Sequence, residues 1–192
     1  MAFTGHAVLA VAPDIPNARI IGLGADGFGG AHDPRLIAAL AGPDGWIDVL
    51  DVLLAGRGTG EASGTGAGPQ LVDRPDLAAH PRARFAAEIR DRRRVLGYPD
   101  RGRSALAVIS TGLAGLTELS FELEPERRGA SGAAALIRDA LSTVPAGELV
   151  VAASAPGNAA SLRALLSTGF SPLGSLQLFR RAHLHDPVTA KD

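Results

Sequence analysis

The stretch Thr117–Ala133 reads TELSFELEPERRGASGA, and it decides the fold of this chain. In its first half Leu119, Phe121 and Leu123 alternate with serine and glutamate, which is the period of a half-buried β-strand. A proline then ends the strand, and a bend of small residues follows at 129–132. The stretch therefore predicts a strand, a turn and the start of a helix.

The residues after this stretch continue the alternation of helices and strands. The apolar spacing predicts a helix from Ala133 to Val144 and a buried strand at Leu149–Ala153. Asn158 is predicted to cap a second helix that ends at Gly169, with Leu162, Leu165 and Leu166 on its inner face. A closing hairpin is predicted over Phe170–Phe179, with its turn near Gly174. This order indicates an α/β layer architecture.

The residues upstream predict shorter elements. Expected strands are Ala7–Ala12, Arg19–Leu23, Arg94–Tyr98 and Ala105–Thr111. Three helices are expected. The first begins at Asp33-Pro34, the second runs over Trp46–Leu54 and ends at Gly56, and the third spans Asp76–Arg93. The glycine-rich segment 56–70 is predicted to be a flexible loop. We therefore predict an N-terminal strand-and-helix portion at 1–75 and a core at 76–192.

Composition narrows the classes of protein to consider. The chain has 192 residues, 46% of them hydrophobic, and a formal charge of −1, so it predicts a folded domain without the basic footprint of nucleic-acid binding. The absence of cysteine excludes disulfides, thiolate nucleophiles and cysteine-ligated zinc. No signal peptide or membrane span is expected, the histidines suggest no metal site, and a cytoplasmic location follows.

The turn at Arg128–Ala133 is a candidate anion-binding site. Four of its six residues are glycine or alanine, so backbone amides can approach a ligand closely. Those amides and the helix dipole favour a phosphate group. An ordinary tight connection between a strand and a helix explains the turn equally well.

Two motifs resemble those of the GCN5-related N-acetyltransferases (the GNAT superfamily). They are LEPERRGASGA at Leu123–Ala133 and the segment that runs from NAASLR at Asn158–Arg163 to Gly169-Phe170. The resemblance covers about the last ninety residues, and the match before Leu96 is only partial. It implies a mixed sheet flanked by helices, with acetyl-CoA as the acyl donor. It also implies direct transfer of an acetyl or short acyl group to an amine on a small molecule or peptide.

The resemblance also implies the residues that bind the cofactor. These are Phe121, Leu123, Arg128, Gly129, Ala130, Ser131, Gly132, Ala133, Asn158 and Ser161. Three positions depart from the family pattern: Ser131 replaces a glycine, Ala130 replaces a frequent basic residue, and Leu165 replaces the tyrosine that often protonates the departing thiolate. We therefore expect one phosphate contact to be missing and the usual acid to be absent.

Glu118 and Glu122 are the candidate catalytic residues. Transfer requires a base to take a proton from the attacking amine, and a carboxylate can do so directly or through water. Glu118 is the first candidate because family members with a glutamate base carry it on this part of the strand. Glu122, on the same face and nearer the cofactor end, is the alternative. Either glutamate could also be an ordinary solvated residue.

Two other functions remain open at this point. The missing tyrosine allows a non-catalytic or regulatory acyl-CoA-binding module. The segment Gly22–Gly27 (GLGADG) matches a dinucleotide fingerprint, which suggests a nicotinamide-dependent oxidoreductase if a strand precedes it and a helix opens at its third glycine. The identity of the acceptor and the oligomeric state, a homodimer included, are left open by the sequence.

Overall fold

The computed structural model describes residues 1–60, 71–127 and 130–182. The chain forms two compact units: a terminal unit (residues 1–52 together with the chain from Leu173 onward) and a central unit (53–172). This division differs from the predicted boundary at residue 75, because the C-terminal chain returns to the terminal unit. Within the described parts of the chain, no helix is long and apolar enough to cross a membrane.

A mixed sheet forms the centre of the central unit. Its strand order is β4-β9-β8-β7-β6-β5. The strands are β4 (Asp51–Arg57), β5 (Val72–Asp73), β6 (Asp91–Gly97), β7 (Leu106–Thr111), β8 (Thr117–Glu122) and β9 (Leu149–Ser154). Strands β5 to β8 pair antiparallel in succession, whereas β8 and β9 are parallel. The buried residues of β7 and β9 are mostly alanine, valine and leucine, as expected for strands that are covered on both faces.

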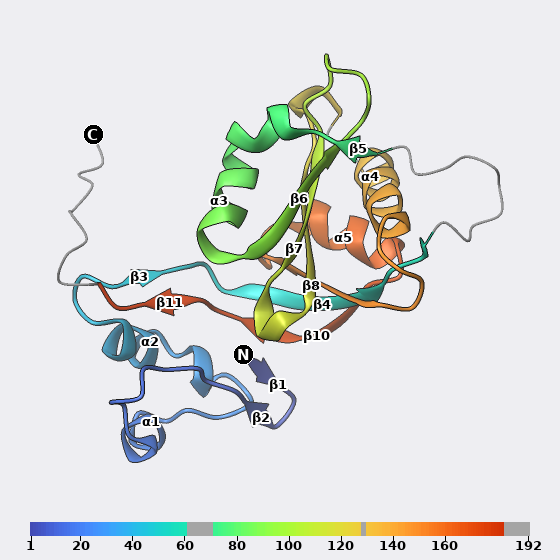
Figure 1. Ribbon diagram of the computed structural model, residues 1–192. Coiled ribbons are helices and arrows are strands. Elements are labelled where there is room, and N and C mark those ends of the chain that lie inside the picture. Colours follow the sequence, from blue (N-terminus) through green and yellow to red (C-terminus); the bar gives the residue numbers. More distant parts are fainter. Residues whose placement is uncertain (61–70, 128–129, 183–192) are drawn as a thin grey trace. The chain divides into compact units, whose positions relative to one another are not determined.

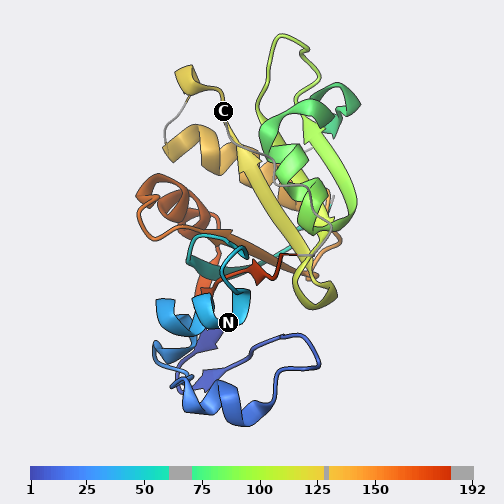
Figure 2. The ribbon, with the colours of Figure 1, turned by 90° about the vertical axis from the view of Figure 1, so that its left-hand side faces the viewer.

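Helices cover both faces of this sheet. Helix α3 (Pro81–Ile89) lies on one face, and α4 (Ala130–Ser142) and α5 (Ala159–Ser167) lie side by side on the other (Figures 1 and 2). Leu136 and Ile137 of α4 are fully buried, which accounts for the apolar spacing in its sequence. The predicted α/β class, a mixed sheet flanked by helices, is confirmed.

The terminal unit is built from short elements. They are β1 (Ala2–Phe3), β2 (His6–Ala7), α1 (Asn17–Gly22), α2 (Pro34–Ala41), β3 (Trp46–Ile47), the end of β10 (Ser171–Leu176) and β11 (Phe179–Arg180). Strand β1 pairs with β2 and β10, and β3 pairs with β11. Ile15, Leu36 and Leu40 form its buried core. The predicted start of α2 is confirmed, since the Asp33 carboxylate accepts a hydrogen bond from Arg35 N.

The helix predicted over Trp46–Leu54 is wrong, because β3 and β4 occupy this segment. Leu53 and Leu54 are both buried, as in a strand with neither face in water. A continuous apolar run of this kind satisfies helical spacing by coincidence. Gly56 does not end a helix but lies within β4, where a Cβ would stand 3.0 Å from the Phe170 ring. The rest of the predicted loop at 61–70 lies outside the described residues.

The predicted hairpin at Phe170–Phe179 is also wrong. Strand β10 continues through Gly174 to Leu176 and pairs with β1, with Ala2 opposite Ser175. Gly174 is needed for close approach rather than for a turn, since a Cβ there would lie 2.2 Å from the Ala2 carbonyl oxygen.

Four smaller expectations also fail. The strand expected over Ala7–Ala12 is present only at Ala7, the last residue of β2. Arg19–Leu23 lies mainly in α1 rather than in a strand, and the helix predicted over Asp76–Arg93 is divided among a 3₁₀ turn (Pro75–Ala79), α3 and the start of β6. Leu166 is 48% exposed, so it does not belong to the inner face of α5. The elements that form in these segments are short, and periodicity is a weak guide over so few residues.

Candidate active site

A cavity of about 340 Å³ opens in the central unit at the C-terminal end of β8. Its walls come from the first turn of α3, the end of β8 and the first turns of α4 and α5. Phe121, Glu122 and Leu123 form the strand wall. The volume of the cavity lies in the range of small-molecule binding sites.

The pairing of β8 with its neighbours explains why space exists here. Antiparallel pairing with β7 runs along the whole of β8, from Thr117 to Glu122. Parallel pairing with β9 consists of Thr117 opposite Val150 and Glu118 opposite Val151. Beyond Glu118, therefore, β8 is paired on its β7 side alone within the described chain. Backbone groups on the other side of its second half are placed to meet a ligand.

The cavity extends to both faces of the sheet. Side chains alternate along β8, so Glu122 shares a face with Glu118, whose partner Arg90 follows α3. Leu123 points to the opposite face, where a Cβ on Gly132 of α4 would lie 3.7 Å from its Cδ1 atom. Because both Glu122 and Leu123 line the cavity, the open edge of β8 connects the α3 side with the α4–α5 side.

The first turn of α5 forms one wall on the α4–α5 side. Asn158 caps this helix, as predicted, because its side-chain oxygen accepts a hydrogen bond from Ser161 N at 3.2 Å. Asn158, Ala160 and Ser161 all line the cavity. The positive end of the helix dipole therefore lies at this wall.

The first turn of α4 forms the neighbouring wall. Ala133 lines the cavity, and a Cβ on Gly132 would lie 3.0 Å from the Arg127 carbonyl oxygen, so glycine allows the tight turn here. The predicted contacts of Arg128 and Gly129 lie outside the described residues. Ala130 and Ser131 open α4 as its first backbone residues. Two helix N-termini thus meet at one cavity, an arrangement that favours an anionic ligand.

The two candidate glutamates have different environments. Glu118 is 5% exposed and forms an ion pair with Arg90, and a Cβ at Gly112 would overlap its carboxylate. Glu122 lines the cavity with its side chain 33% exposed, and its Oε2 lies 3.5 Å from Arg82 Nε. Glu122 is therefore better placed to exchange a proton with a bound ligand.

The described chain places no tyrosine at the cavity that could act as the acid that the resemblance implies. Leu165, at the matching position, is 1% exposed and packs in the core. Tyr98 does not line the cavity: the Arg103 guanidinium stacks 3.8 Å from its ring centroid, and its hydroxyl pairs with Asp139. Burial, reinforced by the Asp139 charge, raises the pKa of Tyr98.

Restoring a tyrosine at Leu165 is expected to damage the core. We expect Leu165→Tyr to lower the free energy of unfolding by about 1–3 kcal/mol, because the ring must enter a packed region. Leu166→Tyr, at an exposed neighbouring position, should have little effect. Urea denaturation of both variants measures the difference, and equal stability of the two would contradict the buried position of Leu165.

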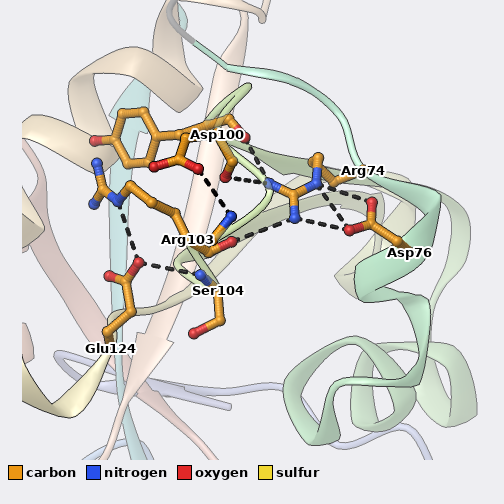
Figure 3. Close-up of polar contacts among 8 residues, drawn as sticks. Arg74, Asp76, Asp100, Arg103, Ser104 and Glu124 are labelled. Carbon is orange, nitrogen blue, oxygen red and sulfur yellow. Dashed lines mark hydrogen bonds and ion pairs between the residues drawn. The ribbon is translucent and has the colours of Figure 1, made fainter.

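A buried arginine that the sequence did not single out braces this region (Figure 3). Arg74 is 4% exposed and pairs with Asp76 at 2.7 Å. Its guanidinium also donates to the carbonyl oxygens of Tyr98, Asp100 and Arg103, at 2.6, 3.1 and 3.3 Å. These bonds satisfy a buried charge and hold the loop between β6 and β7.

The same loop holds the chain that follows β8. Arg103 Nε and Ser104 N both donate to Glu124 Oε1, at 3.2 and 3.1 Å (Figure 3). Burial raises the pKa of Glu124, but the bonds from Arg103 and from backbone amides outweigh it, so the net shift is downward. Arg82, which lines the cavity beside Glu122, was also not identified from the sequence.

The bonds from Arg103 and Ser104 to Glu124 join residues 21 and 20 positions apart. No local sequence pattern indicates contacts between residues so far apart.

The structure excludes a Rossmann arrangement at Gly22–Gly27. Ile20 and Ile21 lie in α1 rather than in a strand. After them, the Asp26 carboxylate accepts the N–H groups of Phe28, Gly29 and Gly30 at 2.8–2.9 Å, which closes a compact turn. The strand that the dinucleotide fingerprint requires is therefore absent from this described segment.

Comparisons with known proteins show similarity to solved structures but not to sequence families or curated proteins. No protein-family model matches the sequence, and no curated protein matches it. Among solved structures, the chain is similar to a protein from Novosphingobium aromaticivorans DSM 12444 that is assigned as an acetyltransferase of the GNAT family. The two share 21% identity with a TM-score of 0.46, and the match covers 73% of this chain and 69% of the other.

Proposed function

We propose that this chain is a GNAT-type N-acyltransferase that moves an acetyl or short acyl group from acyl-CoA to an amine. One observation carries the proposal: the cavity at the open edge of β8 extends from two helix N-termini on one face of the sheet to Glu122 on the other. An acyl donor and an acceptor could therefore approach one another from opposite faces. The motifs at Leu123–Ala133 and Asn158–Arg163 supply much of the donor side.

The donor side fits the chemistry of coenzyme A. The pyrophosphate would lie at the start of α4, where backbone amides and the helix dipole stabilise negative charge. The pantetheine arm, which carries amide groups, would hydrogen-bond along the second half of β8, where pairing with β9 has stopped. Ala133 and Ala160 leave room for it beside Asn158 and Ser161.

On the acceptor side, we propose Glu122 as the general base. Glu122 takes a proton from the acceptor's ammonium group, and the freed nitrogen attacks the thioester carbonyl carbon. The nitrogen–carbon bond forms as the carbon–sulfur bond breaks, and the sulfur leaves with the electron pair as a thiolate. The second proton that the nitrogen must lose then passes to this thiolate, which is released as the coenzyme A thiol. A thiol pKa near 8.5 makes this a tolerable leaving group without a dedicated acid. The chain has no cysteine, so an acyl-cysteine intermediate is excluded.

The second candidate function is a non-catalytic acyl-CoA-binding module. The buried, apolar Leu165 favours it, because no acid stands at the usual position. Release of free thiol from acetyl-CoA in the presence of amines separates the two functions. Binding of acetyl-CoA without release of thiol in the presence of any tested amine would support the non-catalytic module.

Acetyl-CoA is expected to stabilise the protein. A ligand at a hundred times its dissociation constant contributes about 2.7 kcal/mol, which raises the melting temperature by roughly 5–10 °C for a chain of this size. Ala160→Trp should abolish this shift, because an indole ring at the first turn of α5 would fill the cavity.

Ala159→Trp provides the matched control for this experiment. Ala159 is also exposed in the first turn of α5 but does not line the cavity, so its variant should keep the full shift. An unchanged melting temperature of the wild-type protein with saturating acetyl-CoA would rule out the proposed function. Equal shifts for both variants would place the binding site elsewhere.

A further inference from the structure

The acceptor side of the cavity carries a pair of opposite charges. Arg82 and Glu122 both line the cavity, with Arg82 Nε and Glu122 Oε2 3.5 Å apart. A charge-assisted hydrogen bond between these groups would measure about 2.7–2.9 Å. The pair is therefore loose, and the buried Arg82 Nε atom has no hydrogen-bond partner within the described chain. A buried donor left in this way costs free energy unless a ligand or water satisfies it.

Local structure holds Arg82 at this position. Pro81 opens α3, and the His80 ring accepts a hydrogen bond from Arg82 N through Nδ1 at 3.2 Å. The cap fixes the backbone of the first turn, so the guanidinium extends from an anchored residue. With its side chain 41% exposed, Arg82 remains accessible to a ligand.

A positive and a negative group placed side by side complement a small zwitterion. In a free α-amino acid, one carbon separates the ammonium group from the carboxylate. The ammonium group would pair with Glu122, which is the role that the base requires, and the carboxylate would accept hydrogen bonds from the guanidinium of Arg82. A peptide N-terminus has no carboxylate at this position, and a simple amine leaves the arginine unsatisfied.

We infer that the acceptor is a free α-amino acid, which Arg82 recognises by its carboxylate. This inference rests on the proposed acyltransferase function and identifies its substrate class. Arg82 determines specificity, whereas the proton transfer belongs to Glu122. The product is then an N-acylated amino acid, released together with the coenzyme A thiol.

The test compares matched acceptors. Free thiol is followed with saturating acetyl-CoA and each of the twenty amino acids, its amide, or the corresponding decarboxylated amine. We expect kcat/KM for the best amino acid to exceed that for its amide by at least about 10-fold. This factor is the contribution of a hydrogen bond between the charged Arg82 and the substrate carboxylate, which the amide lacks. Arg82→Gln should raise the KM for the amino acid by about 10–100-fold and leave the KM for acetyl-CoA unchanged.

Arg84→Gln is the matched control, because Arg84 is exposed on the same helix and does not line the cavity. A second readout does not depend on turnover: the amino acid should raise the melting temperature of the complex with unacylated coenzyme A, and Arg82→Gln should remove that shift. Equal transfer to amino acids and amides would overturn the inference and leave the acyltransferase function standing. Binding of acetyl-CoA without transfer to any acceptor and without amino-acid binding would overturn both.

Discussion

Glu122→Gln is expected to lower kcat by about 10²–10⁴-fold, the contribution of a positioned general base. The amide keeps the size of the side chain and its place beside Arg82 but cannot accept the ammonium proton. Binding of acetyl-CoA should be unchanged, because the proposed donor site lies on the α4–α5 side of the cavity. Single-turnover release of thiol, with calorimetric titration of the cofactor, measures the two effects separately.

Glu126→Gln is the charge-matched control for this experiment, since Glu126 is exposed and does not line the cavity. Glu118→Gln is the informative comparison. If the Glu122 variant keeps its activity while a folded Glu118→Gln protein loses it, then the base is Glu118. If both variants remain active, the proton leaves through water or through a group on the acceptor.

Arg90→Met is expected to reduce the free energy of unfolding by about 3–5 kcal/mol, because it leaves the buried Glu118 carboxylate without its partner. The side chains of Arg90 and Glu118 are only 10% and 7% exposed, so water cannot replace the lost ion pair at low cost. Equilibrium urea denaturation provides the measurement. Arg93→Met, at an exposed position nearby in β6, should change stability by less than about 0.5 kcal/mol.

The double variant Arg90→Met/Glu118→Gln tests the cause of that loss. Neutralising the carboxylate removes the unpaired charge, so much of the stability should return. A loss no smaller in the double variant than in Arg90→Met alone would show that packing of the arginine stem, rather than its charge, stabilises this end of α3.

The sequence predicted the segment from β8 to α5 well because each signal there is local. Alternation identified β8, small residues marked the start of α4, and Asn158 marked the cap of α5. These features depend on neighbours within a few positions. The two motifs selected five residues that line one cavity: Phe121, Leu123, Ala133, Asn158 and Ser161.

Predictions failed where tertiary contacts decide the structure. The apolar run that includes Leu53 and Leu54 became a strand because both faces of the sheet are covered, a fact that the run itself does not contain. We propose Glu122 rather than Glu118 as the base for a related reason. The partner that engages Glu118, Arg90, is 28 residues away in the sequence, and only the packing of α3 on β8 brings the two together.

The brace around Arg74 limits how the cavity could be redesigned. One guanidinium holds three carbonyl groups of the loop after β6, and through Arg103 that loop holds Glu124 just beyond β8. Lengthening or shortening this loop would therefore disturb the strand end that bears Glu122 and Leu123. Arg82, the residue of the first turn of α3 that lines the cavity, pairs with Glu122 rather than with this loop. An engineer who seeks a new acceptor should vary that turn and keep the loop at its present length.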